Sequence, residues 1–223
     1  MAEVTIVSTS HIAGESLERV RKAINEKEPD CVAVELDVGR YRYFSQGREA
    51  GHIEIMKNLG VMSFLLYWVM KKIQIYFSRK TGILPGTEMV SAVNIARGKN
   101  LNIAFIDRPI EGTLLRMKNI PLGEKLGIFK MLLLGMLGLA VPSAVPLKKK
   151  SIDLNRVPPS ELVEQAMHEL KKRLPSFYRI LVEERDRIMA RNLITLNKRF
   201  ERIVCVVGAG HEKGLSRFLE RKH

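Results

Sequence analysis

The chain has 223 residues, of which 46% are hydrophobic and 27% are charged, a composition typical of a folded globular protein and not of a disordered one. Lysine and arginine outnumber aspartate and glutamate by 37 to 24, which gives a net charge of +13. This excess indicates either an acidic partner (nucleic acid, anionic lipid or an acidic substrate) or basic helix surfaces that keep the protein soluble. Nucleic acid is the least favoured partner, because the sequence has no recognition motif and only 6% aromatic residues.

The two cysteines and the apolar stretches indicate where the chain resides. Cys31 and Cys205 both lie in apolar segments, so we expect small buried side chains in a reducing compartment rather than a disulfide. The chain begins with a strand-like segment instead of a signal peptide, which predicts a location on the cytoplasmic side. Two apolar stretches, 58–70 and 131–147, are too short or too interrupted by proline to span a bilayer. We expect them to form buried or interfacial helices, with contact to a membrane surface or a second subunit as possible roles.

Taken in chain order, apolar segments rich in β-branched residues alternate with segments of helical periodicity. The predicted strands are 4–10, 31–37, 101–107 and 202–208, and the main predicted helices are about 15–28, 87–99, 161–174, 177–198 and 214–222. This alternation predicts an α/β fold with a largely parallel central sheet flanked by helices. We expect a single domain over residues 1–223, with a helical insertion at about 110–200 before the last strand.

Each predicted strand ends in polar or ionisable residues. These residues are Ser8–His11, Glu35 and Asp37, Asp107 and Arg108, and Gly208–His211. Parallel strands end at the same edge of a sheet, and ligands of open α/β sheets bind outside that carboxyl edge. The sequence therefore predicts that two histidines, three carboxylates and an arginine converge in one crevice. The glycines that precede the last histidine are expected to let the backbone turn tightly, so that the imidazole faces the crevice.

A strand must end in something polar, so one such residue by itself indicates nothing. Glu35 is more informative, because it follows three apolar residues and an unpaired buried carboxylate is costly. We favour a functional role for Glu35 and, somewhat less strongly, for His11 and His211.

Two further segments have simpler interpretations. The segment 183–187 lies on a long predicted helix, where its spacing most simply indicates a surface stripe of ion pairs, with Arg185 and Asp186 as weaker candidates for the crevice. The segment "HEKGL" begins like a zinc-protease motif, but Leu215 stands where the second histidine belongs. Gly214 is also expected to break a helix there.

Six segments in this order, "TSH", "VAVELDVGRY", "PGTEM", "IDRPIEGTLLR", "LVEERDRIMARNL" and "VVGAGHEKG", resemble the TraB/PrgY (pheromone-shutdown) family over nearly the whole chain. That family is related to the Tiki proteins and, more distantly, to the erythromycin-esterase and ChaN-like group. Its archaeal members usually carry a membrane-spanning region beyond this domain, so the resemblance implies that the chain is the soluble portion of a longer protein.

The resemblance implies a metal-dependent hydrolase with two G-x-x-H motifs and a strand glutamate. The second motif is intact at 208–211, whereas in the first, at 8–11, serine replaces the glycine and the histidine remains. His11, Glu35 and His211 would hold a divalent ion (zinc, manganese or cobalt) and leave one position open for water. The ion would lower the pKa of that water and produce hydroxide near neutral pH.

The resemblance also implies roles for the remaining motif residues. Asp107 or Glu184 would act as the general base. Arg108 or Arg185 would hold a substrate carboxylate or the developing oxyanion. The further candidates for ligand binding are Arg40, Glu88, Arg116 and Asp186.

The function most favoured at this point is a metal-dependent hydrolase, specifically a peptidase that acts on peptides or pheromone-like signals. The alternative is a non-catalytic module that binds or sequesters a peptide together with a membrane partner. A nucleic-acid binder is the third hypothesis, and only the net charge of +13 supports it.

Overall fold

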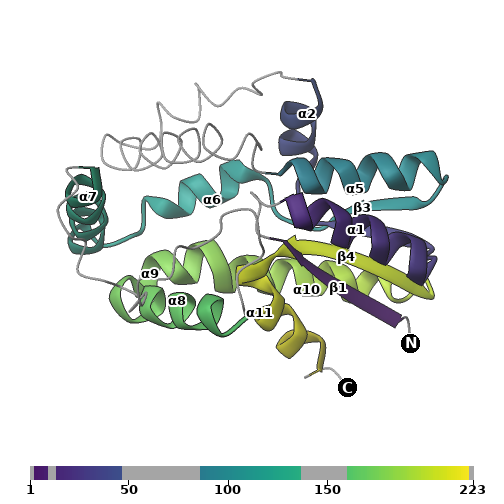
Figure 1. Ribbon diagram of the computed structural model, residues 1–223. Helices are drawn as coiled ribbons and strands as arrows, with labels where there is room; N and C mark the ends of the chain where they lie inside the picture. The colour runs from purple at the N-terminus through teal and green to yellow at the C-terminus, as the bar shows by residue number, and fades with distance from the viewer. Residues whose placement is uncertain (1–2, 10–13, 47–85, 137–159, 221–223) are drawn as a thin grey trace.

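The computed structural model of the chain describes residues 3–9, 14–46, 86–136 and 160–220. Within these ranges the strands are β1 (Glu3–Thr9), β2 (Cys31–Val34), β3 (Asn102–Phe105) and β4 (Arg202–Gly208). They form one sheet in the order β1-β4-β2-β3, and every neighbouring pair is parallel (Figure 1). The predicted α/β fold with a parallel central sheet is therefore confirmed.

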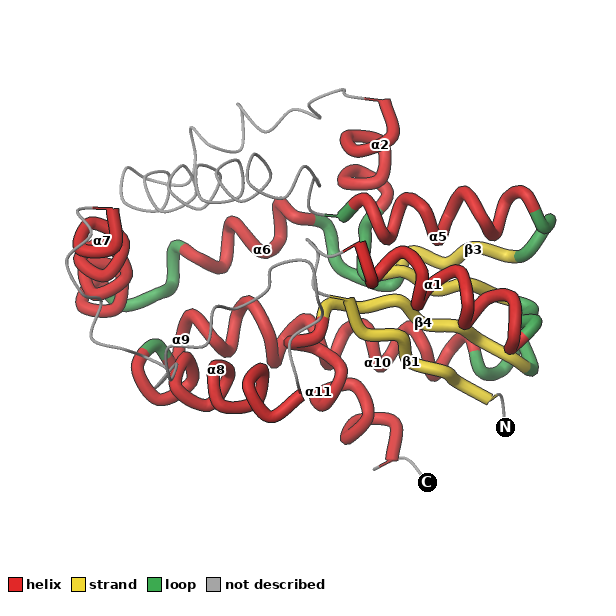
Figure 2. Tube along the Cα trace, viewed as in Figure 1, coloured by secondary structure: helices red, strands yellow, loops and turns green. Residues whose placement is uncertain are grey.

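Helices make up most of the rest of the described chain (Figure 2). Those that precede β3 are α1 (Gly14–Lys27), α2 (Val38–Gln46) and α5 (Thr87–Gly98). Those between β3 and β4 are α6 (Ile110–Met117), α7 (Leu122–Met136), α8 (Ser160–Arg173), α9 (Pro175–Tyr178), the π-helical turn η1 (Arg179–Glu183) and α10 (Glu184–Leu196). The last is α11 (Ala209–Glu220). Every described element between β3 and β4 is thus helical, as the predicted insertion requires.

The two faces of the sheet have separate hydrophobic cores, because successive residues of a strand point to opposite sides. In β2, Val32 and Val34 pack with the core that includes α1 and α5, whereas Cys31 and Ala33 pack with the core that includes α10 and α11. Helices therefore cover both faces. This explains why the central strands are apolar at every position rather than at every second one.

Both cysteines are free thiols that are completely buried in the core on the α10 and α11 side. Burial, assisted by the charge of Asp30, raises the pKa of Cys31 to about 11. Burial likewise raises the pKa of Cys205. The thiols remain protonated at neutral pH and act as small apolar side chains, so the expectation of buried, unpaired cysteines is confirmed.

Two sequence predictions about helices are wrong. The long helix expected over 177–198 is divided into α9, the π-helical turn η1 and α10. A π-helical turn differs from an α-helix by one extra residue, which apolar periodicity does not reveal. Helix α11 also continues through Gly214 instead of breaking there. A single glycine costs a helix only about 1 kcal/mol, which does not end it. At this position a glycine is needed, because a carboxylate from α10 occupies the space of any side chain.

Among the described residues, no helix is both long and apolar enough to cross a bilayer. The apolar stretch 58–70 lies outside the described residues, and only 131–136 of the second stretch are described, as the end of α7. Contact of either stretch with a membrane or a second subunit therefore stays a prediction.

Candidate functional site

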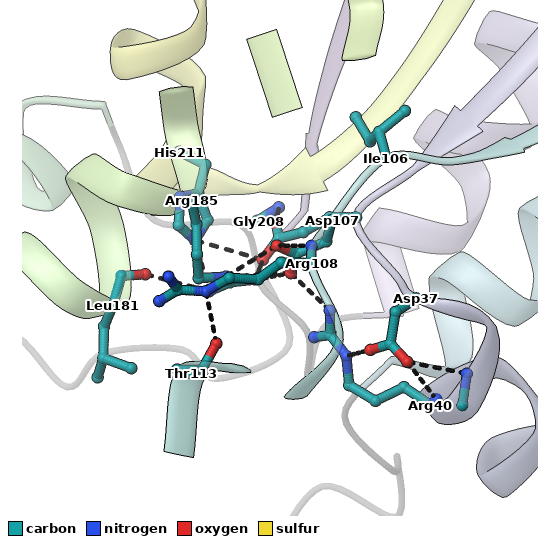
Figure 3. Close-up of polar contacts among 12 residues, drawn as sticks. Asp37, Arg40, Ile106, Asp107, Arg108, Thr113, Leu181, Arg185, Gly208 and His211 are labelled. Atoms are coloured by element: carbon teal, nitrogen blue, oxygen red, sulfur yellow. Dashed lines mark hydrogen bonds and ion pairs between the residues drawn. The ribbon is translucent and has the colours of Figure 1, made fainter. Parts of the chain in front are cut away.

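The carboxyl ends of the central strands meet at one edge of the sheet, as the sequence predicted. The parallel register aligns the ends of β2, β3 and β4, so Glu35, Asp107 and His211, which follow these strands, come to the same edge. Figure 3 shows Asp107 and His211 there, near Gly208 at the end of β4. The Gly208 N–H donates to Glu35 Oε2 at 2.7 Å and ties the end of β4 to the residue after β2. The predicted convergence of these three ionisable side chains is therefore observed.

A single guanidinium, that of Arg185 on α10, joins these side chains. Its Nη2 donates to Glu35 Oε1 and, at 2.6 Å, to Asp107 Oδ2, and its Nε donates to the same Asp107 oxygen at 3.0 Å. Its Nη1 donates to the Leu181 carbonyl oxygen at 3.2 Å and lies 3.0 Å from His211 Nε2. An arginine has five N–H donors, and these contacts engage all of them. Figure 3 shows the guanidinium held at the centre of the polar network.

The charges around Arg185 fix the ionisation of the site. Burial by itself would lower the pKa of Arg185, but the negative charges of Glu35 and Asp107 raise it above its ordinary value. Burial would raise the pKa of Asp107, but the charges of Arg185 and Arg40 outweigh this effect and lower it. Asp107 is therefore held as a carboxylate between two arginines, and such a carboxylate accepts a proton poorly.

Arg40 is a second arginine that binds Asp107, at the same carboxylate oxygen as Arg185. Its Nη2 donates to Asp107 Oδ2 at 2.5 Å, and its Nε donates to Asp37 Oδ2 at 2.6 Å. Asp37 Oδ1 accepts the backbone N–H groups of Gly39 at 2.8 Å and of Arg40 at 3.1 Å, as an N-terminal helix cap does. The start of α2 therefore positions a second cation at the sheet edge.

His211 forms a buried pair with Asp186 of α10. Its Nδ1 lies 2.6 Å from Asp186 Oδ1, and its Nε2 lies 3.3 Å from Glu35 Oε1. Because Arg185 has no acceptor and its Nη1 faces Nε2, these contacts assign the proton to Nδ1 and the lone pair to Nε2. Burial raises the pKa of Asp186, although the hydrogen bond from His211 opposes that effect.

The positions of Arg185 and Asp186 correct the surface-stripe interpretation. The Arg185 side chain is only 14% exposed and that of Asp186 only 5%. In the same segment, Glu183 does pair with an exposed residue, Lys171, at 2.6 Å. Helical spacing could not distinguish the buried residues of this segment from the exposed ones, because both kinds are charged.

Gly214 is a site residue that the sequence did not reveal. A Cβ atom there would lie 1.9 Å from Asp186 Oδ2 and 2.6 Å from its Cγ. The glycine thus provides the space in which Asp186 reaches the imidazole one turn earlier in α11. Gly86 is the only described glycine with a positive φ, so Gly208 and Gly210 do not use the left-handed backbone that glycine adopts most readily. The chain nevertheless turns from β4 directly into α11, and His211 faces the network as expected.

A second polar group lies beside this network and is centred on Arg108. Its Nε donates to Thr113 Oγ1 at 2.8 Å, its Nη1 donates to Glu184 Oε2 at 3.0 Å and its Nη2 donates to the Ile180 carbonyl oxygen at 2.6 Å. Arg116, whose side chain is exposed, pairs with the same Glu184 oxygen at 3.0 Å. Burial lowers the pKa of Arg108, although Glu184 opposes that effect.

The π-helical turn η1 supports both arginine groups. The carbonyl oxygens of Ile180 and Leu181, which belong to this turn, accept hydrogen bonds from the side chains of Arg108 and Arg185 respectively. Single π-helical turns occur frequently at functional sites, and here the turn supplies acceptors to two buried cations.

Of the remaining predicted residues, one lies elsewhere along the sheet edge and one is not described. Glu88, in the first turn of α5, is buried, and its Oε1 lies 3.4 Å from the hydroxyl of Thr9, the last residue of β1. Glu88 therefore belongs to the β1 side of the edge. His11, the predicted partner of His211 as a metal ligand, lies outside the described residues.

The described residues alone do not fit a divalent metal ion. They contain no group of three histidine, cysteine, aspartate or glutamate side chains arranged to hold one. Glu35 Oε1 and His211 Nε2 are ligand atoms of a suitable kind 3.3 Å apart, but Arg185 donates to both and occupies the lone pairs that a metal would use.

Comparison with known proteins gives one consistent result. Residues 2–222 match the model of the TraB/PrgY/gumN family. The chain is 32% identical over 227 residues to an uncharacterized protein of Methanocaldococcus jannaschii, with 98% of this chain and 54% of that protein covered. It is 28% identical to TraB domain-containing proteins of Bos taurus over 244 residues and of Homo sapiens over 243, with 97% of this chain and 62% of each relative covered. The chain therefore spans between half and two thirds of the length of these relatives.

Substituting Gly214 by alanine tests whether Asp186 is held against α11. The added methyl group would displace the carboxylate, so we expect the free energy of unfolding to fall by about 1–3 kcal/mol in urea denaturation. Gly112→Ala is the matched control, because nothing lies within 4 Å of a Cβ atom there. That change should raise the free energy of unfolding by up to about 1 kcal/mol, because alanine favours a helix more than glycine does. Equal stabilisation by both changes would refute the packing inferred for Gly214.

Removing the guanidinium of Arg185 should destabilise the protein, because two buried carboxylates then lack their cation. We expect Arg185→Met to lower the free energy of unfolding by about 3–5 kcal/mol, because Glu35 and Asp107 lose their shared partner. Arg185→Lys should recover only part of this loss, since an ammonium cannot reproduce the planar five-donor geometry. Arg191→Met, at an exposed position of the same helix, should change stability by less than about 0.5 kcal/mol. A loss at position 185 no larger than that at 191 would contradict this account.

The lowered pKa of Asp107 predicts how stability depends on pH. The folded state binds a proton at Asp107 less readily than the unfolded chain does, so this carboxylate stabilises the protein above the ordinary pKa of 3.8. That stabilisation is lost as the pH falls through 3.8 towards the lower folded-state pKa. The difference in unfolding free energy between the wild type and Asp107→Asn should therefore be largest near about pH 7 and shrink below about pH 5. A difference independent of pH, measured by denaturant titration, would disprove the ionic role of Asp107.

Proposed function

The chain belongs to the TraB/PrgY/gumN family, and on this premise we propose that it is a hydrolase that cleaves peptide bonds at the carboxyl edge of its sheet. One observation carries the proposal, namely the buried pair of Asp186 and His211, whose Nε2 faces Glu35 and Arg185. An imidazole that is oriented by a carboxylate at Nδ1 and keeps its lone pair at Nε2 has the arrangement of a general base.

In the proposed reaction, a water molecule attacks the carbonyl carbon of the peptide bond and transfers a proton to His211 Nε2. Asp186 stabilises the resulting imidazolium through the Nδ1–H bond. The imidazolium then gives its proton to the amine nitrogen as the carbon–nitrogen bond breaks. Arg185 Nη1 must leave Nε2 before the first step, and its N–H groups are then available to the oxyanion of the tetrahedral intermediate.

These roles revise those implied by the resemblance. Asp107 is a poor general base, because Arg185 and Arg40 keep it ionised. Arg108 is anchored by Thr113, Glu184 and the Ile180 carbonyl oxygen, which favours a structural role over substrate binding.

The metal-dependent form of this hydrolase is the second candidate, and one observation favours it. Metal-binding histidines usually donate their other ring N–H to a carboxylate, as His211 does to Asp186. In this form Glu35, His211 and the predicted ligand His11 would hold zinc, manganese or cobalt, which would activate water. Arg185 would first have to release Glu35 and His211.

A non-catalytic peptide-binding module, acting with a membrane partner, is the remaining proposal. The observation that favours it is that every N–H donor of Arg185 already has an acceptor within the protein. The charges of the site are thus neutralised by one another, and its side chains can have a purely structural role. Pheromone-like peptides would be the ligands in either case.

A peptide-cleavage screen with matched histidine variants tests the proposal. His211→Ala should lower the rate of cleavage by about a hundredfold or more, because it removes the general base. His168→Ala is the control, since His168 is an exposed residue of α8 outside the network, and it should leave the rate unchanged. Elemental mass spectrometry of the same preparations distinguishes the two forms of the hydrolase.

Near-stoichiometric metal that disappears in His211→Ala would establish the metal-dependent form. Cleavage that is insensitive to chelators would establish the form in which His211 acts as the base. Peptide binding without any cleavage product would refute the hydrolase and favour the binding module.

A further inference from the structure

Three of the five exposed large hydrophobic side chains in the described chain lie on one helix, α7. The five exposed residues of this kind are Val38, Leu115, Leu122, Leu126 and Phe129. Three of them belong to α7, where Leu122 is 61% exposed, Leu126 49% and Phe129 36%. Their spacing of i, i+4 and i+7 places them on one face of the helix, which we call the α7 stripe. Leu115 lies on α6, the preceding helix.

The opposite face of α7 is firmly attached to the protein, so the stripe is held outward. The Glu124 carboxylate accepts the backbone N–H groups of Ser176 at 3.0 Å and of Phe177 at 3.2 Å, at the start of α9. Ile128 is only 4% exposed and belongs to a core cluster that includes Leu174 and Phe177. Both anchors lie on the side of α7 away from the stripe. In Figure 1, α7 stands at the end of the molecule that is farthest from the sheet.

Lysines flank the stripe on both sides. Lys125 and Lys130 are three and eight residues after Leu122, which places them on either side of the apolar face. Lys125 Nζ donates to the Lys118 carbonyl oxygen at 2.9 Å, and within the described chain none of these three lysines is paired with a carboxylate. Over 122–130, the first part of α7, exposed apolar side chains therefore share one surface with lysines that have no carboxylate partner in the described chain, an arrangement suited to the interface of an anionic membrane.

We propose that α7 docks this protein on the surface of an anionic membrane. Leu122, Leu126 and Phe129 enter the boundary between headgroups and acyl chains, and Lys125 and Lys130 contact the lipid phosphates. The proposed mode is peripheral, because the stripe occupies one face of α7 while the opposite face is attached to the rest of the protein. This proposal is independent of the hydrolase chemistry, since the stripe shares no residue with the sheet-edge site.

Charge complementarity selects an anionic surface over a second copy of the chain. Pairing two α7 stripes would bring their lysines together in a protein whose net charge is already +13. Anionic headgroups would instead neutralise those lysines while the apolar side chains are buried. The stripe also lies along an outward-facing helix rather than in a groove, which suits a lipid surface better than a partner helix.

Vesicle flotation of the full chain tests the proposal. The wild type should bind vesicles that contain phosphatidylserine at least tenfold more strongly than vesicles of phosphatidylcholine alone, and added salt should weaken this binding. Leu122→Ser/Phe129→Ser should lower the partition coefficient about tenfold or more. Lys125→Glu/Lys130→Glu should lower it by a similar factor on anionic vesicles and should leave the weak binding to neutral vesicles unchanged.

Val38→Ser is the matched control, because Val38 is a comparably exposed residue of α2 outside the stripe. Circular dichroism and light scattering of each variant establish folding and oligomeric state. Stripe variants that bind as well as Val38→Ser would overturn the proposal, as would equal binding to both kinds of vesicle. A wild-type dimer that dissociates in the Leu122→Ser/Phe129→Ser variant would overturn it in favour of self-association.

Discussion

One buried cation determines the arrangement at the edge of the sheet. Glu35 follows the fully apolar strand β2, and Asp107 lies just beyond the mostly apolar strand β3. Both carboxylates are buried, and an unpaired carboxylate at such a depth would cost several kcal/mol. Arg185 pairs with both carboxylates, and it also donates to the imidazole of His211. A guanidinium can do this because it presents five donors in one plane, whereas a lysine offers a single charged nitrogen. The ends of three strands are therefore held together by one side chain from α10.

The surrounding structure can be understood as support for that guanidinium. The π-helical turn before α10 supplies the Leu181 carbonyl oxygen to it. Asp107 is also held by Arg40, whose position depends on the helix cap made by Asp37. These supports come from two elements, the turn η1 and the start of α2, and Arg40 is itself held by Asp37. Such interlocking makes the network rigid, because moving one member leaves another buried group without its partner.

The fold was largely predictable from the sequence, whereas the site was predictable only in part. Apolar runs and their alternation with helical periodicity fix a parallel sheet, and strand ends fix which carboxylates meet at its edge. Periodicity alone placed Arg185 on the surface, because a charged side chain that pairs with a distant strand looks the same in sequence as one that faces water. The role of Gly214 depends on the distance between α10 and α11. Distances between helices, and the extra residue of a π-helical turn, are properties of packing that no local pattern contains.

The central cation also constrains any chemistry at this edge. Arg185 donates to Glu35 Oε1 and faces the lone pair of His211 Nε2, and these are the atoms that a general base or a metal ligand would use. A guanidinium and a divalent ion cannot share them, because two cations this close in a buried site would repel strongly. In either form of the hydrolase, Arg185 must therefore withdraw from His211 before a reaction begins. On either proposal, the free energy for this movement has to come from the interactions that a substrate or an ion makes as it enters the site.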